Sequence, residues 1–296
     1  MTADAAARQV DVRGRDGIRL RADVVGDRGS PAVVLLHGGG QTRHSWGATA
    51  RALAETGWLA YAVDLRGHGE SEWAADGDYS LDAFAGDVAA VALQFPEPPA
   101  LVGASLGGVA SLLAVGESEG PLASSLVLVD VAPRIEPSGA QRVGDFMRAN
   151  LSEGFGSLEE VADAVAAYNP HRPRPSDLSG LQRNVRLRPD GRWTWHWDPA
   201  FMAWQDRADV TRPRVLLDPD RLEAAARRVE VPMLLVRGRM SDLLSEAGAH
   251  ELLELVGHAE FADVEGAGHM VAGDRNDPFN AAVTSFLARH RPLTPS

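Results

Sequence analysis

The residues best placed to do chemistry centre on Ser105, in the stretch LVGASLGGVA at 101–110. The apolar run before the serine predicts a strand, and the run after it can open a helix, so Ser105 would occupy a strand-to-helix turn. Such a turn strains the serine backbone and lifts the hydroxyl clear of the sheet, while the small Gly103 and Gly107 let strand and helix approach closely. The glycine spacing alone is a weak signal in a chain with 30 glycines, so the case for a nucleophile rests on this context.

A nucleophilic serine needs a base within hydrogen-bond reach and usually a carboxylate that orients the base. Of nine histidines, His269 fits best, because VEGAGHM places it in a glycine-flanked loop directly after the last apolar run. Two aspartates follow predicted strands and precede this histidine. We favour Asp242, because its strand and that of the histidine would be neighbours. Asp130 stays open as the alternative carboxylate. Its other possible role is to fix the end of its strand or the root of the lid.

Acyl transfer also needs donors for the negative charge that develops on the carbonyl oxygen. The run HGGG at 37–40 ends an apolar stretch and would bring free backbone N–H groups to the carboxyl edge of a sheet. The N–H of Leu106, next to the serine, would be the partner donor. His68, in LRGHGES, is expected to help build a turn.

Alternating strands and helices must position these residues. Continuous apolar runs that end in glycine or polar turns are typical of strands covered on both faces, and helical stretches separate them, so the pattern predicts an α/β fold with a parallel sheet. Alternation around Asp16-Gly17 predicts an antiparallel edge hairpin. One helix is expected to begin at Ser80, and another to end at Gly57.

The region 134–230 breaks this pattern, because it is richer in proline, arginine and tryptophan. It contains a second predicted hairpin around Pro189-Asp190-Gly191, and the parallel-strand pattern returns after it. We therefore expect a core of residues 1–133 and 231–296, interrupted by a lid at 134–230.

Composition limits the function. The chain has 296 residues, a net charge of −12 and no cysteine. The acidic balance argues against nucleic acid or an anionic membrane surface as partner. The absence of cysteine excludes disulfides and thiolate metal sites. Without a signal peptide or a membrane span in the sequence, a cytoplasmic protein acting on a small molecule is expected. The oligomeric state stays open.

Together, HGGGQTRHSW, VDLRGHGES, VGASLGG, VRGRMSD and GAGHM resemble, in order, the motifs of the α/β-hydrolase superfamily, particularly its lidded esterase, haloperoxidase-like and carbon-carbon-bond hydrolase branches. The resemblance implies a Ser105, Asp242, His269 triad, with Gly39 and Leu106 as oxyanion donors. It implies neither a metal nor an organic cofactor.

These motifs predict a serine hydrolase that cleaves a small or medium, hydrophobic carboxylic ester or lactone through an acyl-enzyme. Carbon-carbon bond hydrolysis and perhydrolysis would use the same triad, and a ligand receptor on this fold is a further alternative. Substrate contacts are expected from Gly40 and from tryptophans clustered in RWTWHWDPAFMAW, which could instead pack the lid onto the core. These are Trp193, Trp195, Trp197 and Trp204.

Overall fold

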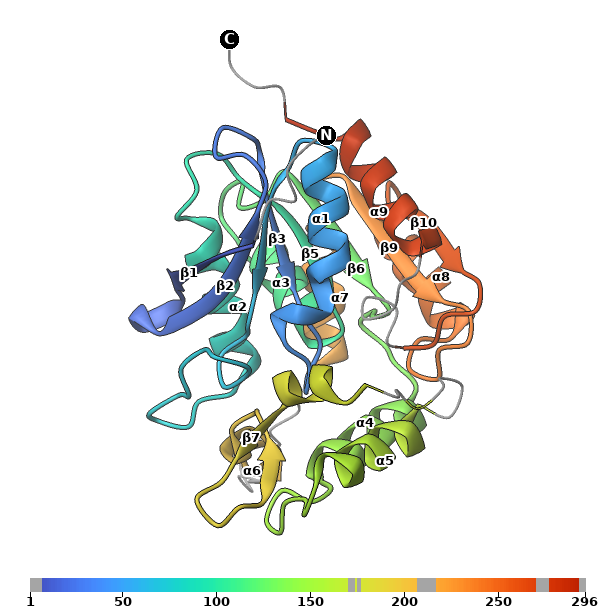
Figure 1. Cartoon of the computed structure of the whole chain (residues 1–296). Coiled ribbons are helices and arrows are strands. Elements are labelled where there is room, and N and C mark those ends of the chain that lie inside the picture. Colours follow the sequence, from blue (N-terminus) through green and yellow to red (C-terminus); the bar gives the residue numbers. More distant parts are fainter. Residues whose placement is uncertain (1–6, 170–173, 175–176, 207–216, 270–276, 293–296) are drawn as a thin grey trace.

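An eight-stranded sheet forms the centre of the computed structural model (Figure 1). The structure describes residues 7–169, 174, 177–206, 217–269 and 277–292, and of residues 204–206 the backbone only. The strand order is β1-β2-β4-β3-β5-β6-β9-β10. The strands of this sheet are β1 (Arg8–Arg13), β2 (Arg19–Val25), β3 (Ala32–Leu36), β4 (Leu59–Val63), β5 (Ala100–Ala104), β6 (Ser125–Val129), β9 (Met233–Gly238) and β10 (Glu260–Val264).

The sheet is parallel except at one edge. β1 and β2 form the predicted antiparallel hairpin, joined through the short 3-10 helix η1 (Arg15–Gly17), and β2 is also antiparallel to β4. The remaining neighbours are parallel, so their carboxyl ends meet along one edge. The predicted α/β fold with a mostly parallel sheet is confirmed.

Helices cover both faces of the sheet, as the two buried clusters show. On β3, Val34 and Leu36 pack with one layer, and Val33 and Leu35 pack with the other. The first layer holds α2 (Leu81–Ala92), α3 (Leu106–Gly116), α7 (Pro219–Arg227) and α8 (Glu246–Leu255). The second holds α1 (Gly47–Glu55) and α9 (Asp277–Arg289), with the 3-10 helix η2 (Arg43–Trp46) before α1.

Local signals set the ends of two helices as predicted. The Ser80 hydroxyl oxygen accepts a hydrogen bond from the N–H of Ala83 at 3.1 Å and caps the start of α2. Gly57 follows α1 with φ +86°, a left-handed conformation that glycine adopts without strain.

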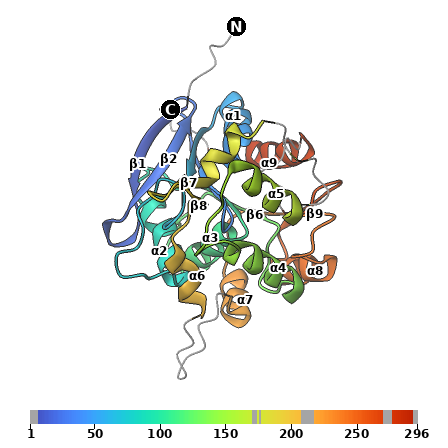
Figure 2. The ribbon, with the colours of Figure 1, turned by 60° about the horizontal axis from the view of Figure 1, so that its bottom comes forward.

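Between β6 and α7 the chain leaves the sheet and forms a separate group of elements, which we call the insertion (the described residues of 134–218). The insertion lies beyond the carboxyl ends of the parallel strands, and Figure 2 brings it forward. Its elements are α4 (Pro137–Arg148), α5 (Leu158–Tyr168), the 3-10 helix η3 (Ser179–Asn184), β7 (Val185–Leu187), β8 (Trp193–Trp195) and α6 (Pro199–Asp206). β7 and β8 form the second predicted hairpin.

The insertion is shorter than the expected range of 134–230, because α7 belongs to the core. Leu222, Ala225 and Ala226 of α7 are buried in the first helical layer. A side chain added at Gly116 of α3 would lie 2.3 Å from the Ala225 carbonyl oxygen, so the two helices are in close contact. The sequence of α7 is rich in charged residues, so its apolar face is not evident from composition.

Glycines at the turn between β5 and α3 allow the strand, the helix and the neighbouring loop to pack together. A Cβ added at Gly107 would lie 2.5 Å from the Leu36 carbonyl oxygen, and one at Gly103 would lie 2.5 Å from the Gly107 carbonyl oxygen. Backbone atoms cannot move aside as a flexible side chain can. The predicted need for small residues at this turn is confirmed.

We expect Gly107→Ala to lower the free energy of unfolding by roughly 1–3 kcal/mol, because its methyl group overlaps backbone. Urea unfolding of the variant and the wild type measures this difference. Gly120→Ala is the matched control, since a Cβ there meets nothing within 4 Å. Equal stability of Gly107→Ala and Gly120→Ala would contradict the packing described.

Candidate active site

Ser105 occupies the tight turn between β5 and α3. Its backbone angles are φ +46° and ψ −115°, a left-handed φ that a serine adopts only under constraint. The turn is held from both sides, because the Ser105 N–H donates to the Val129 carbonyl of β6 and the Gly107 N–H donates to the His37 carbonyl. The strained strand-to-helix turn expected from the sequence is present.

His269 approaches the same edge of the sheet from the loop after β10, and its partner is Asp130. His269 Nδ1–H donates to Asp130 Oδ2 at 2.7 Å. The Asp130 side chain is fully buried, and the His269 side chain is 10% exposed. Asp130 also accepts hydrogen bonds from the N–H of Gly238 at 3.0 Å and the hydroxyl of Ser241 at 2.6 Å. Three donors therefore fix the orientation of this carboxylate.

The preference for Asp242 as the carboxylate that orients His269 was wrong. Asp242 lies past the end of β9, where its side chain is 40% exposed and pairs with Arg142 of α4 at 2.8 Å. The strands β9 and β10 are neighbours, as expected, but β6 also borders β9. Asp130, with φ +52°, follows β6 directly and turns its carboxylate toward the histidine loop. Adjacency of strands thus left the choice between the two aspartates undecided.

The two expected oxyanion donors lie close to each other. A Cβ added at Gly39 would be 4.0 Å from the Leu106 side chain. Within the described residues, the N–H groups of Gly39 and Leu106 have no hydrogen-bond partner, whereas those of Gly38 and Gly40 donate to Gln41 and His68. The glycine loop and the first turn of α3 therefore each carry a backbone N–H without a partner among the described residues.

Two cavities that share part of their lining contact Ser105 next to α4 of the insertion. The smaller, of about 40 Å³, is lined by Ser105 and His269 together with Gly39, Phe146 and Tyr168, among others. The larger, of about 110 Å³, is an apolar chamber that includes Ser105 and Leu106. Neither described lining includes Asp, Glu, Lys or Arg. Serine and histidine thus share a hollow that suits an uncharged group.

The sequence reasoning missed most of this lining. α4 contributes Val143, Phe146 and Met147, and α6 contributes Phe201 and Met202. The spacing of the three α4 residues, which places them on one helix face, was the available signal. Without the fold, that face could not be told from one packed on the core.

The clustered tryptophans mainly pack the insertion. Trp195 and Trp197 stack with ring centroids 4.9 Å apart, and Trp195 donates from Nε1 to the Ala149 carbonyl. The described lining of both cavities includes none of Trp193, Trp195 and Trp197. Gly40, the other proposed substrate contact, lines the smaller cavity. The side chain of Trp204 lies outside the described residues.

Three buried histidines lie behind the glycine loop and were not expected there. The rings of His37 and His68 are 5.3 Å apart, and those of His68 and His196 are 5.8 Å apart. Burial lowers the pKa of His37 to about 4 and that of His68 to about 3, and it lowers the pKa of His196 well below 6.5. These imidazoles are therefore neutral near pH 7. His68 also forms the predicted turn, because its backbone N–H donates to the Leu65 carbonyl oxygen.

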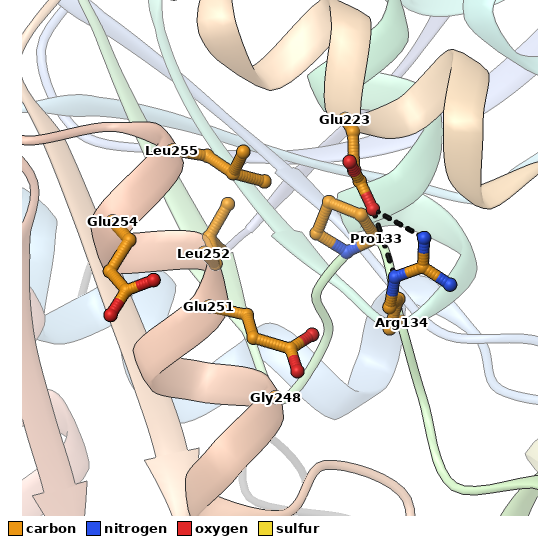
Figure 3. Close-up of a pocket in the computed structure, with 8 residues that line it drawn as sticks. All are labelled: Pro133, Arg134, Glu223, Gly248, Glu251, Leu252, Glu254 and Leu255. Atoms are coloured by element: carbon orange, nitrogen blue, oxygen red, sulfur yellow. Dashed lines mark hydrogen bonds and ion pairs between the residues drawn. The ribbon is translucent and has the colours of Figure 1, made fainter.

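A third cavity, of about 260 Å³, lies at the root of the insertion, away from Ser105 (Figure 3). Its lining includes Glu223 of α7 and Glu251 and Glu254 of α8, and Arg134 pairs with Glu223 at 2.8 Å. It contains neither serine nor histidine. Of these three cavities, only the two at Ser105 therefore contain residues for which the sequence predicts acyl-transfer chemistry. No described helix has the length and hydropathy to cross a membrane.

Comparison with known proteins identifies the family of this chain. The family model described as "Alpha/beta hydrolase family" matches residues 33–282. The chain therefore belongs to the alpha/beta hydrolase family and is an enzyme of the hydrolase class.

The chain is similar to individual hydrolases of known name. The chain is 33% identical to an esterase of Mycobacterium tuberculosis over 252 residues, which are 83% of this chain and 79% of that protein. It is 27% identical to a 3-hydroxybutyrate-oligomer hydrolase of Cupriavidus necator, over 82% of this chain and 84% of that protein. A crystal structure of the mycobacterial esterase superposes with a TM-score of 0.71 at 29% identity, over 95% and 92% of the two chains. The crystal structure of an E-2-(acetamidomethylene)succinate hydrolase superposes with a TM-score of 0.79 at 26% sequence identity. The match covers 96% of this chain and 99% of that chain.

The buried histidines predict a specific loss of stability in acid. The unfolded chain protonates each imidazole near pH 6.5, whereas the folded chain leaves His37 and His68 neutral down to about pH 4 and 3. The unfolded state then binds more protons, so stability falls as the pH drops from 6.5 toward 4. Each such histidine adds about 1.4 kcal/mol per pH unit to the slope.

Urea unfolding between pH 7 and pH 5 measures this slope. His68→Gln should make it shallower, because one protonation is removed from the unfolded state. His258→Gln, at an exposed histidine, is the matched control and should keep the wild-type slope. If His68→Gln left the slope of stability against pH unchanged, the buried imidazoles would not be the cause of the stability loss in acid.

Proposed function

We propose that this enzyme cleaves a small or medium, hydrophobic carboxylic ester or lactone through an acyl-enzyme formed on Ser105. One observation carries the proposal: His269 Nδ1–H is held by the buried Asp130 carboxylate, and His269 lines the same cavity as Ser105 on its strained turn. Asp130 takes the place in the triad that the sequence had assigned to Asp242. Ser105, His269 and Asp130 thus supply the nucleophile, the base and the orienting carboxylate that acyl transfer requires.

The reaction proceeds in two halves. His269 Nε2 accepts the hydroxyl proton as Ser105 Oγ attacks the carbonyl carbon, while Asp130 fixes the tautomer and stabilises the imidazolium. The N–H groups of Gly39 and Leu106 bind the resulting oxyanion. The imidazolium then gives its proton to the leaving alcohol oxygen, and the C–O bond breaks. Water, deprotonated by His269, attacks the acyl-enzyme. The imidazolium then returns this proton to Ser105 Oγ as the acyl C–O bond breaks, which releases the acid and restores the enzyme.

The cavities favour an apolar acyl or alcohol group. Their described lining contains no Asp, Glu, Lys or Arg, and the chamber next to Leu106 is built mainly of aliphatic side chains with Phe201 and Met202. Burial of a hydrocarbon group there supplies binding free energy in proportion to its area. The insertion provides α4 and α6 to this lining, so we propose that it acts as the lid of the site.

Active-site labelling tests the nucleophile. A fluorophosphonate should label the wild type at one serine, because the tetrahedral phosphorus adduct mimics the acyl-transfer intermediate. Ser105→Ala should not be labelled. Ser111→Ala is the matched control, because Ser111 is buried on α3 and donates to the Gly107 carbonyl. Labelling of Ser105→Ala at the wild-type rate would remove Ser105 from the mechanism.

A pair of substitutions decides between the two aspartates. Asp130→Asn should lower kcat for p-nitrophenyl butyrate by roughly 10³–10⁴-fold, because an amide in place of the carboxylate no longer holds the required tautomer. Asp242→Asn removes only an exposed ion pair and should cost less than about tenfold. Rates are taken per folded molecule, with thermal unfolding of each variant measured in parallel. The reverse order of the two effects would return the role to Asp242.

A further inference from the structure

Gly40, next to the oxyanion donor Gly39, contacts an imidazole through each of the two peptide groups that flank its Cα atom. Its N–H donates to His68 Nε2 at 3.2 Å, and its carbonyl oxygen faces His196 Nε2 at 3.4 Å. Gly40 has φ +73°, so the loop turns sharply at this residue. The Gly40 N–H belongs to the peptide that follows the one carrying the Gly39 N–H, and the Gly40 carbonyl belongs to the peptide after that. The two histidines therefore hold the loop directly after the expected oxyanion donor.

The tautomers of both histidines follow from their other contacts. His196 Nδ1 accepts the Gly69 N–H at 2.8 Å, which leaves the proton on Nε2, facing Gly40. His68 Nδ1–H donates to the Arg66 carbonyl at 2.9 Å, which leaves Nε2 as the acceptor for Gly40. Each ring thus gives one hydrogen bond and receives one, as a neutral imidazole can.

His196 belongs to the insertion, and its neighbours fasten that part of the insertion to the core. The Asp198 N–H donates to the Gly67 carbonyl at 2.8 Å, and the Tyr79 hydroxyl donates to Asp198 Oδ2 at 2.5 Å. Arg186 donates to the Gly69 carbonyl. His196 is therefore a fixed point of contact between the insertion and the glycine loop.

We propose that His196 is a positioning residue: through the Gly40 carbonyl it aligns the Gly39 N–H for the oxyanion, so that the insertion completes the oxyanion hole. This inference rests on the proposed ester hydrolysis. His196 does not line either cavity in the described residues, so it acts through the loop rather than by touching substrate.

Two isosteric substitutions separate its two hydrogen bonds. In His196→Asn the amide oxygen can replace Nδ1 and accept from Gly69, but the side chain is too short to reach Gly40. In His196→Gln the longer side chain can replace Nε2–H and donate to Gly40, while the contact with Gly69 is lost. If His196 only stabilised the fold, the two substitutions would change catalysis by the same amount.

The readout is the ratio of kcat/KM for p-nitrophenyl butyrate to that for its thiono analogue, in which sulfur replaces the carbonyl oxygen. Sulfur accepts hydrogen bonds poorly, so the ratio reports on the oxyanion donors. His196→Asn should lower the ratio by roughly 10-fold or more, mainly through kcat, and His196→Gln should stay near the wild type. Rates are counted per fluorophosphonate-labelled site, so only folded enzyme contributes.

Equal ratios in wild type, His196→Asn and His196→Gln would overturn the positioning role, as would an equal loss in both variants. The proposed function fails by a different result. If the wild type hydrolysed p-nitrophenyl butyrate no faster than Ser105→Ala, ester hydrolysis at Ser105 would be wrong, and the role of His196 in it would be wrong as well.

Discussion

The Asp130 carboxylate is the interaction on which the arrangement of the site depends. It lies at the end of β6 and accepts hydrogen bonds from Gly238 at the end of β9, from Ser241 in the following turn and from His269 beyond β10. Buried polar groups are costly when unpaired, so a carboxylate with three donors holds these segments to one geometry. The histidine is thereby brought to the edge of the sheet where the turn of α3 presents Ser105.

Much of this frame could be predicted, because its signals are local. Apolar runs identified the buried strands, and glycine spacing with a strand before it identified Ser105. The choice of carboxylate was a different problem, because Asp242 follows β9, the neighbour of the strand that leads to His269, whereas Asp130 follows β6, one strand further away, and still reaches the histidine. The hydrogen bond between His269 and Asp130 and the ion pair between Asp242 and Arg142 favour Asp130, and neither contact is visible in a pattern of residue types.

The insertion was the part least accessible to sequence reasoning. Its boundary depends on the apolar face of α7. Trp195 and Trp197 pack against each other, and Trp195 packs against Phe146 of α4, rather than toward Ser105. The cavity lining comes instead from α4 and α6. Composition marked this region as distinct, but the contacts that give it a role, including those of His196, join residues far apart in the sequence.

The central claim is that Asp130 holds His269 for catalysis, and the proton between them can be observed directly. An imidazole Nδ1–H hydrogen-bonded to a buried carboxylate gives a far-downfield proton resonance in NMR spectra, separate from the amide region. We predict this resonance in the wild type and in Asp242→Asn, and its absence in Asp130→Asn. Its survival in Asp130→Asn together with its loss in Asp242→Asn would contradict the account.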